Sequence, residues 1–193
     1  GADNDISYDI ANDSDGNSYI TGNYFSSSIT FGNITLTKNN GYNDIFIAKL
    51  DSYGTWSWAK QIGGDKFDVA NGIIVDSSKN IFVTGSFTSS SITFGNITLT
   101  NTQSEKSDIF VAKLSYNGNW SWATQAGGTK TDVSNSIAID SRGNSYITGI
   151  FYSGSITFGS ITLNNSGNGD IFVAKLNSSG SWLWAKQTGG TGY

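Results

Sequence analysis

The chain is built from short runs in which hydrophobic and polar residues alternate, each bounded by Gly, Asn, Asp or Ser. Alternation with a period of two is typical of β-strands that bury one face. We therefore expect four main strands and one short hairpin in the central part of the chain, with the strands at residues 72–76, 81–87, 108–114 and 120–125 and the hairpin at 91–99.

Turn-forming segments separate these predicted strands. Asp-Ser-Ser-Lys-Asn at residues 76–80 predicts the turn of the first hairpin, and Ser-Tyr-Asn-Gly-Asn at 115–119 predicts the turn of the last. Because the connections are short, the strands that they join run antiparallel.

The same pattern occurs three times along the chain. The segment at residues 17–22 returns at 80–85 and 144–149, with offsets of 63 and 64 residues. Two further segments recur in the same order, Asp-Ile-Phe-(Ile/Val)-Ala-Lys-Leu at 44–50, 108–114 and 170–176, and Trp-x-Trp at 56–58, 120–122 and 182–184. We divide the chain accordingly into repeats 1–64, 65–128 and 129–190, and residues 191–193 start a further repeat or form a tail.

The repeat length favours one fold class. A four-stranded antiparallel unit cannot bury both of its faces alone, so it stacks on its neighbours. Radial stacking gives the blades of a β-propeller, and we expect an all-β protein with three such blades. A β-trefoil or β-prism also suits three copies, and a linear β-solenoid is a further alternative.

Composition excludes several kinds of site. The chain has no His, Cys, Met or Pro, so zinc sites built on His or Cys and Ser-His-Asp catalysis are excluded. A bound metal would be a hard cation held by oxygen. The formal charge of −4 gives nucleic acid no general attraction. No apolar run approaches the roughly 20 residues that cross a bilayer, so we expect a soluble segment without membrane insertion. The absence of Met indicates a mature product or an excised segment.

Three segments carry a resemblance to a known family. Residues 137–149, followed by 170–176 and 184–190, resemble the SBBP-type β-propeller repeat of bacterial and archaeal surface proteins, although the inserted hairpin makes this repeat longer. The resemblance implies secretion or surface display in large modular proteins and supplies no catalytic residues. Three blades do not close a ring, so we expect either a segment of a larger ring or two chains that pair to give about six blades.

Aromatic residues provide the candidate ligand-binding positions. In a regular strand the two rings of each Trp-x-Trp pair lie on one face; an open face suits sugar stacking, and a closed one suits packing between blades. The candidates are Trp56, Trp58, Trp120, Trp122, Trp182, Trp184, Tyr24, Phe87 and Phe151. A lectin requires some of these rings to be exposed beside Asp or Asn, whereas a scaffold buries them.

Carboxylates provide the remaining candidates. Asp13, Asp15 and Asn17 resemble the start of a calcium loop, but no bidentate Glu follows them and the same segment makes a turn. Asp44 and its equivalents precede identical strands and are expected to bind backbone donors there. We therefore expect no enzyme and no required cofactor, and interpret the chain as a binding or scaffold module. A multivalent carbohydrate-binding lectin is the first alternative, and a propeller hydrolase or lyase is the second.

Overall fold

A computed structural model describes residues 2–39, 41–101, 103 and 105–191. Within these residues every regular element is a β-strand. The strands are β1 (Asp5–Asn12), β2 (Ser18–Tyr24), β3 (Ser28–Phe31), β4 (Ile34–Thr37), β5 (Asp44–Leu50), β6 (Trp56–Ile62), β7 (Asp68–Val75), β8 (Ile81–Phe87), β9 (Ser91–Phe94), β10 (Ile97–Thr100), β11 (Asp108–Leu114), β12 (Trp120–Gly128), β13 (Asp132–Ile139), β14 (Ser145–Phe151), β15 (Ser155–Phe158), β16 (Ile161–Asn164), β17 (Asp170–Leu176) and β18 (Trp182–Thr188).

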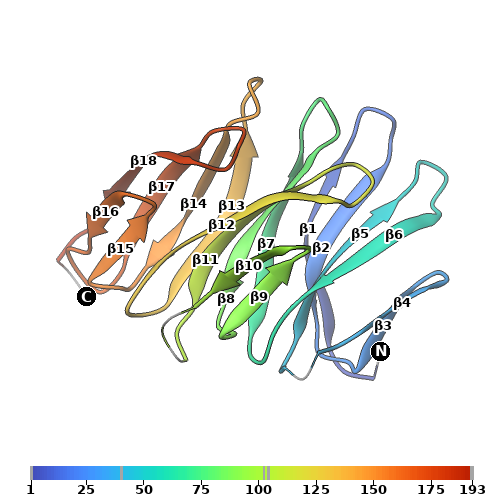
Figure 1. Cartoon of the computed structure of the whole chain (residues 1–193), viewed down its shortest axis with the longest axis horizontal. Helices are drawn as coiled ribbons and strands as arrows, with labels where there is room; N and C mark the ends of the chain where they lie inside the picture. Colours follow the sequence, from blue (N-terminus) through green and yellow to red (C-terminus); the bar gives the residue numbers. More distant parts are fainter. Residues whose placement is uncertain (1, 40, 102, 104, 192–193) are drawn as a thin grey trace.

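The main strands form three antiparallel sheets, which stand side by side as blades (Figure 1). Blade 1 has the order β1-β2-β5-β6, blade 2 the order β7-β8-β11-β12 and blade 3 the order β13-β14-β17-β18. The first strands of neighbouring blades lie together at one edge. There the Ile73 amide donates to Asp9 Oδ2 at 2.9 Å, and the Asn71 side-chain amide donates to the Ser134 carbonyl at 2.9 Å. The all-β, blade-like fold is as predicted.

Most predicted strand limits agree with the observed ones, and the differences have local causes. Strand β7 begins four residues earlier than the alternation indicated, because a bulge between Ala70 and Gly72 leaves Asn71 unpaired and interrupts the pattern. Strand β12 continues to Gly128 because its last residues pair with a hairpin from the next repeat.

One of the inserted hairpins pairs with a strand of the preceding blade. Hairpin β15–β16 of the third repeat pairs antiparallel with β12 of blade 2, through Phe158 with Ala126 and Ile156 with Gly128. The side-chain amide of Gln125, also in β12, exchanges hydrogen bonds with the backbone of Thr100 at 2.9 and 3.1 Å, and so holds hairpin β9–β10 of its own blade. The outer strand of blade 2 therefore holds two hairpins at once.

Most of the hydrophobic core lies between the blades, and a smaller cluster lies within blade 1, between its sheet and hairpin β3–β4. One cluster joins Ile45 and Ile47 of blade 1 to Phe110 and its neighbours in blade 2, and a second joins Ile109 and Val111 of blade 2 to Phe172 and its neighbours in blade 3. Burial of one such side chain stabilises the fold by about 1.5 to 3 kcal/mol. Stacking of blades is therefore the main source of stability.

The described residues include no helix that is long and apolar enough to cross a membrane.

Candidate functional sites

The Trp-x-Trp pairs do not present both rings on one face, and that prediction is wrong. In blade 1, Trp56 pairs with Leu50 and Trp58 pairs with Lys49, so Ser57 is an extra residue in a bulge. The extra residue reverses the alternation of side chains, and the two indoles point to opposite faces. The same register shift occurs in blades 2 and 3, so it affects Trp120 with Trp122 and Trp182 with Trp184.

Each indole then has a separate packing partner. The first Trp of each pair packs on the Phe of its own hairpin, with ring centroids 4.9 Å apart for Trp56 and Phe31. The second Trp contacts the next blade: Trp58 Nε1 donates to the Tyr116 carbonyl at 3.1 Å, and Trp122 Nε1 donates to the Ser178 carbonyl at 3.1 Å. Trp184, in the last blade, is 36% exposed. The Trp residues therefore pack the blades and do not form an open row.

The other aromatic candidates are completely enclosed. Tyr24, Phe87 and Phe151 each have an exposed fraction of 0%. Phe87 and Phe151 lie in the two clusters between blades, and Tyr24 packs with Phe31 and Phe46 under the first hairpin. None of the three rings offers a face on which a sugar could stack.

Asp13 is engaged within its own turn. Its Oδ1 accepts the amides of Asp15 at 2.9 Å and Asn17 at 3.0 Å, and its Oδ2 accepts the Asn17 side-chain amide at 2.8 Å and the Tyr19 hydroxyl at 3.0 Å. Burial opposes ionisation, but the hydrogen bonds from Asn17 and Tyr19 outweigh it and hold the pKa of Asp13 below its ordinary value. No group of three acidic side chains suited to a metal occurs among the described residues. This geometry favours the turn interpretation, and calcium binding stays a prediction.

The Asp residues at the strand entries are buried and structural. Asp44 Oδ2 accepts the Asn39 amide at 2.8 Å and the Gln61 side-chain amide at 2.7 Å, as the structural interpretation predicts. Burial raises the pKa of Asp68 to about 6. Burial, with the neighbouring charge of Asp132, raises that of Asp108 to about 7. Each blade boundary therefore encloses carboxyl groups that resist ionisation.

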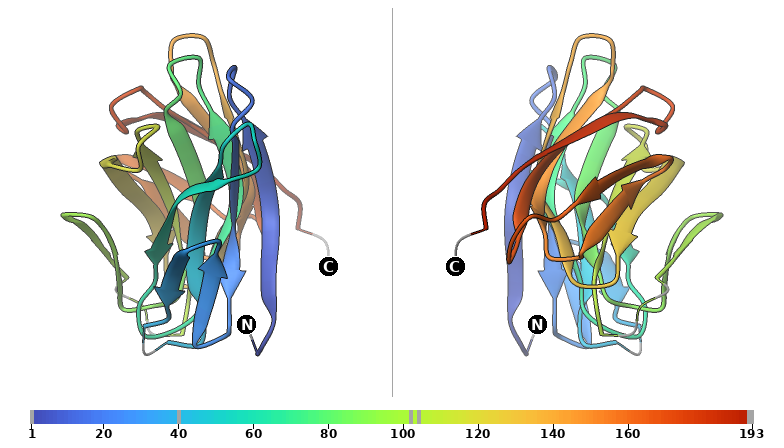
Figure 2. Two further views of the ribbon diagram at one scale, coloured as in Figure 1. Left: turned by 90° about the vertical axis from the view of Figure 1, so that its right-hand side faces the viewer. Right: turned by 90° about the vertical axis from the view of Figure 1, so that its left-hand side faces the viewer.

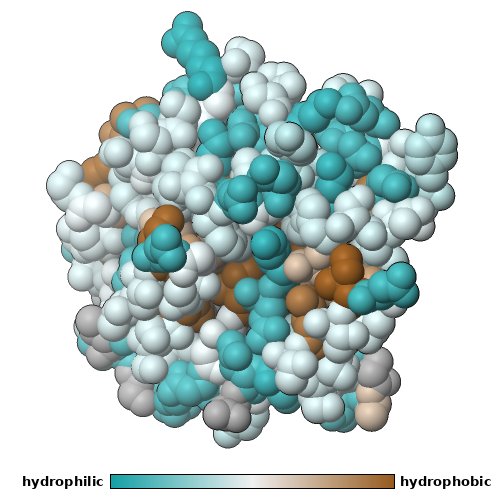
Figure 3. Space-filling model, turned by 45° about the vertical axis from the view of Figure 1, so that its right-hand side comes forward, coloured by the Kyte–Doolittle hydropathy of each residue, from teal (hydrophilic) through white to brown (hydrophobic). Residues whose placement is uncertain are grey.

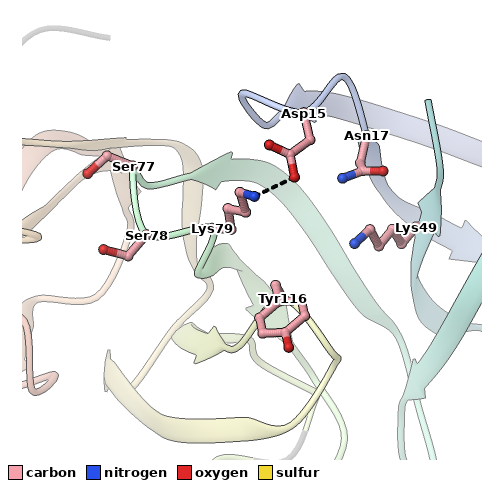
Figure 4. A pocket seen from close by; sticks show the side chains of 7 residues that line it. All are labelled: Asp15, Asn17, Lys49, Ser77, Ser78, Lys79 and Tyr116. Atoms are coloured by element: carbon pink, nitrogen blue, oxygen red, sulfur yellow. Dashed lines mark hydrogen bonds and ion pairs between the residues drawn. The ribbon is translucent and has the colours of Figure 1, made fainter.

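A hollow of about 560 Å³ lies between blades 1 and 2, where the turns of both blades meet (Figure 4). Asp15 and Asn17 line it from blade 1, together with Lys49, whose Nζ lies 5.8 Å from the ring centroid of Tyr116 in blade 2. Lys79 forms an ion pair with Asp15 across the hollow (Figure 4). The site thus combines an aromatic ring that is 57% exposed with polar and charged groups.

The sequence interpretation did not identify Tyr116 or Lys49. A signal was present, because Tyr116 occupies a turn position at which the other repeats have Ser52 and Ser178. A single aromatic residue at a position that is Ser in the other two repeats indicates a binding position that is specific to blade 2.

The two end faces of the row are open, and Figure 2 views each of them. On blade 3, Ile171 and Val173 are 52% and 40% exposed, whereas their equivalents in blades 1 and 2 are 0% exposed. On blade 1, Ile10 is 59% exposed, whereas its equivalents Ile73 and Ile137 are 3% and 8% exposed. Seen obliquely from the blade 1 end, hydrophobic patches lie between polar side chains (Figure 3).

Comparison with known proteins identifies a repeat family and a similar protein. Residues 57–92 and 121–149 match the beta-propeller repeat family called SBBP. The chain is also 30% identical over 169 residues to an uncharacterized WD repeat-containing protein of Acanthamoeba polyphaga mimivirus. That match covers 79% of the chain and 12% of the viral protein, so the chain spans about an eighth of the length of this relative.

Proposed function

Because the chain carries β-propeller repeats of the SBBP type, we propose that it is a non-catalytic scaffold module of a secreted or cell-surface protein, whose end faces bind further blades of the same kind. The scaffold role and the surface location are proposed from the match to the repeat family. The WD repeats named for the viral relative agree with a binding or scaffold role. Two copies of this chain would give about six blades, which is within the usual number of blades in a propeller.

The exposure of Ile171 and Val173 carries this proposal. Side chains that are fully covered at both inner boundaries are open at the end of the row. Contiguous exposed apolar surface of this kind marks interaction sites in soluble proteins. At the blade 3 end, β18 is the last strand of its sheet, whereas the equivalent strand β12 pairs with a hairpin of the next repeat, so the edge of β18 is available to another strand.

The solution mass of the purified chain, measured by light scattering over a range of concentrations, tests the proposal. We expect twice the mass of one chain, and we expect replacement of Val173 by Lys to return the mass to that of one chain. Replacement of the exposed Thr98 by Lys is the control, because Thr98 lies on hairpin β9–β10 of blade 2, away from both end faces. A single-chain mass at every concentration would contradict the self-association.

Carbohydrate binding is the second candidate, and the exposed ring of Tyr116 beside Asp15 and Asn17 favours it. An aromatic face next to hydrogen-bonding groups suits a sugar ring. Only one such position occurs in the described repeats, so this site would be single and not multivalent. Calorimetric titration with a panel of monosaccharides, for the natural chain and for Tyr116→Ala, tests it. Tyr53→Ala is the control, because Tyr53 lies in the equivalent turn of blade 1 and is 93% exposed.

A further inference from the structure

We propose that the partner at the open ends is a second copy of this chain, bound head to tail, and that its hairpin β3–β4 adds to the edge of β18. This inference rests on the proposed function and specifies its interface. Blade 3 of one copy would receive blade 1 of the next, in the same geometry as the two boundaries within the chain.

The apolar faces support this arrangement. At the boundary between blades 2 and 3, a Cβ added at Gly72 would lie 3.3 Å from Cγ2 of Ile137. The equivalent positions at the open ends are Ser136 of one copy and Ile10 of the next. Ser136 lines a mainly apolar hollow of about 310 Å³ on blade 3, with Tyr146 and Val173. Ile10 of the second copy would fill this hollow.

The free edge of β18 supports the hairpin addition. Within the chain, the end of β12 pairs with β15, through Gly127 with Thr157 and Gly128 with Ile156. The same register places Gly190 of one copy opposite Ile29 of the next. A Cβ at Gly128 would overlap the Ser155 carbonyl, and a Cβ at Gly64 would overlap that of Ser91. At Gly190 no heavy atom of the described residues lies within 4 Å of such a Cβ.

The indole of Trp184 supports the same register. Trp58 and Trp122 donate to carbonyls in the last turn of the following blade, and that turn carries Gly118 and Gly180 against the two indoles. The equivalent turn of blade 1 ends at Gly54, where an added Cβ meets no heavy atom of the described residues within 4 Å. In the assembly, Trp184 Nε1 would donate to the Ser52 carbonyl of the second copy.

Engineered disulfides test the head-to-tail contact, and the natural chain has no Cys to interfere. Ser136→Cys and Ile10→Cys are prepared as separate variants, mixed, and oxidised. We expect a covalent dimer in the mixture only, because the proposed interface places Ser136 against position 10 as Gly72 is placed against Ile137, where a Cβ at Gly72 lies 3.3 Å from Cγ2 of Ile137. A covalent dimer from either variant alone, or none in the mixture, overturns the proposal.

A glycine substitution tests the hairpin addition. Gly190→Ser adds a side chain that the single chain accommodates but that overlaps the hairpin backbone in the assembly. We expect at least a tenfold weaker association with an unchanged melting temperature of the dissociated chain. Gly154→Ser is the matched control, because a Cβ there also meets no described heavy atom within 4 Å and the other repeats carry Ser27 and Ser90 at this position.

The outcomes distinguish an error in the proposed self-association from an error in this interface alone. If the natural chain has a single-chain mass at all concentrations, both the self-association and this interface are wrong. If it associates but Gly190→Ser has no effect and the mixed Cys variants do not crosslink, this interface alone is wrong and another surface joins the copies.

Discussion

Several glycines of this protein are required by close contacts rather than by turns. Gly85 lies in β8, where it pairs with Ala70 and Phe110. A Cβ at this position would overlap the carbonyl oxygen of Val69, which is backbone and cannot rotate away. The equivalent Gly22 and Gly149 face the carbonyls of Ile6 and Val133 in the same way. The bulge in each first strand brings its backbone this close.

We expect Gly85→Ala to lower the free energy of unfolding by about 2 to 3 kcal/mol, because the added methyl forces two strands apart in a packed core. Chemical denaturation followed by Trp fluorescence measures the change. Gly154→Ala, where the described residues leave open space, is the control and should change stability by less than about 0.5 kcal/mol. Equal effects of the two substitutions would contradict the contact.

The buried carboxyl groups predict a pH dependence. The pKa of Asp68 is about 6 and that of Asp108 about 7 in the folded chain, both above the ordinary value of 3.8. Between these values and 3.8 the folded state binds more protons than the unfolded state, so stability falls as pH rises. We expect the free energy of unfolding to be roughly 4 kcal/mol larger at pH 5 than at pH 8, with about 1 kcal/mol from Asp68 and about 3 kcal/mol from Asp108.

Urea titrations at the two pH values measure this difference. Asp108→Asn removes one of the two groups and should reduce the difference. Asp51→Asn is the control, because Asp51 lies in an exposed turn and caps only local amides. Greater stability at pH 8 than at pH 5 would show that these carboxyl groups do not control the pH dependence.

At the level of single elements, β12, the outer strand of blade 2, does most of the joining. Its bulge turns Trp120 toward its own hairpin and Trp122 toward blade 3, and its last residues pair with hairpin β15–β16. The one extra residue, Ser121, therefore lets a single strand contact three different elements.

We expect Trp122→Phe to destabilise the chain by about 1 kcal/mol or more, because it removes the hydrogen bond to the Ser178 carbonyl and part of the packing on blade 3. Trp184→Phe is the matched variant at the open end. In the dissociated chain, Trp184→Phe should have the smaller effect, since Trp184 is 36% exposed. Thermal unfolding of both variants gives the comparison, and a larger effect at Trp184 would contradict it.

At the scale of the whole molecule, blade 2 is the only one of the three described blades that is covered on both faces. Strands β8 and β11 at its centre carry Phe82, Phe110 and Val111 with exposed fractions of 0%. In an array of stacked repeats, stability depends on the number of neighbour interfaces. The end blades each have one such interface.

We therefore expect amide hydrogen exchange to be slowest in β8 and β11 and fastest in β1 and β18 of the single chain. Exchange followed by mass spectrometry on peptides resolves these strands. Conditions that favour association should protect β18 and hairpin β3–β4 in particular. Uniform protection across the three blades would contradict the stacked-array description.

Local sequence patterns were enough to predict the repeats, most of the strand limits and the fold class. Strands β8 and β11 could be predicted to the residue, because alternation and turn residues are local properties and recur in every copy. The structural role of Asp44 and the turn made by Asp13 also followed from local patterns, since their partners lie within a few residues or on the adjoining strand.

Which side chains are exposed depends on strand pairing and on how the blades stack. The alternation rule placed both indoles of each Trp pair on one face. The Trp-Ser-Trp segment alternates with or without a bulge, and the bulge at Ser57 arises only from the pairing of β6 with β5. Ile10 and Ile73 have the same place in their repeats, yet one is 59% and the other 3% exposed. That difference depends on whether another blade lies beside the residue, and no local pattern records it.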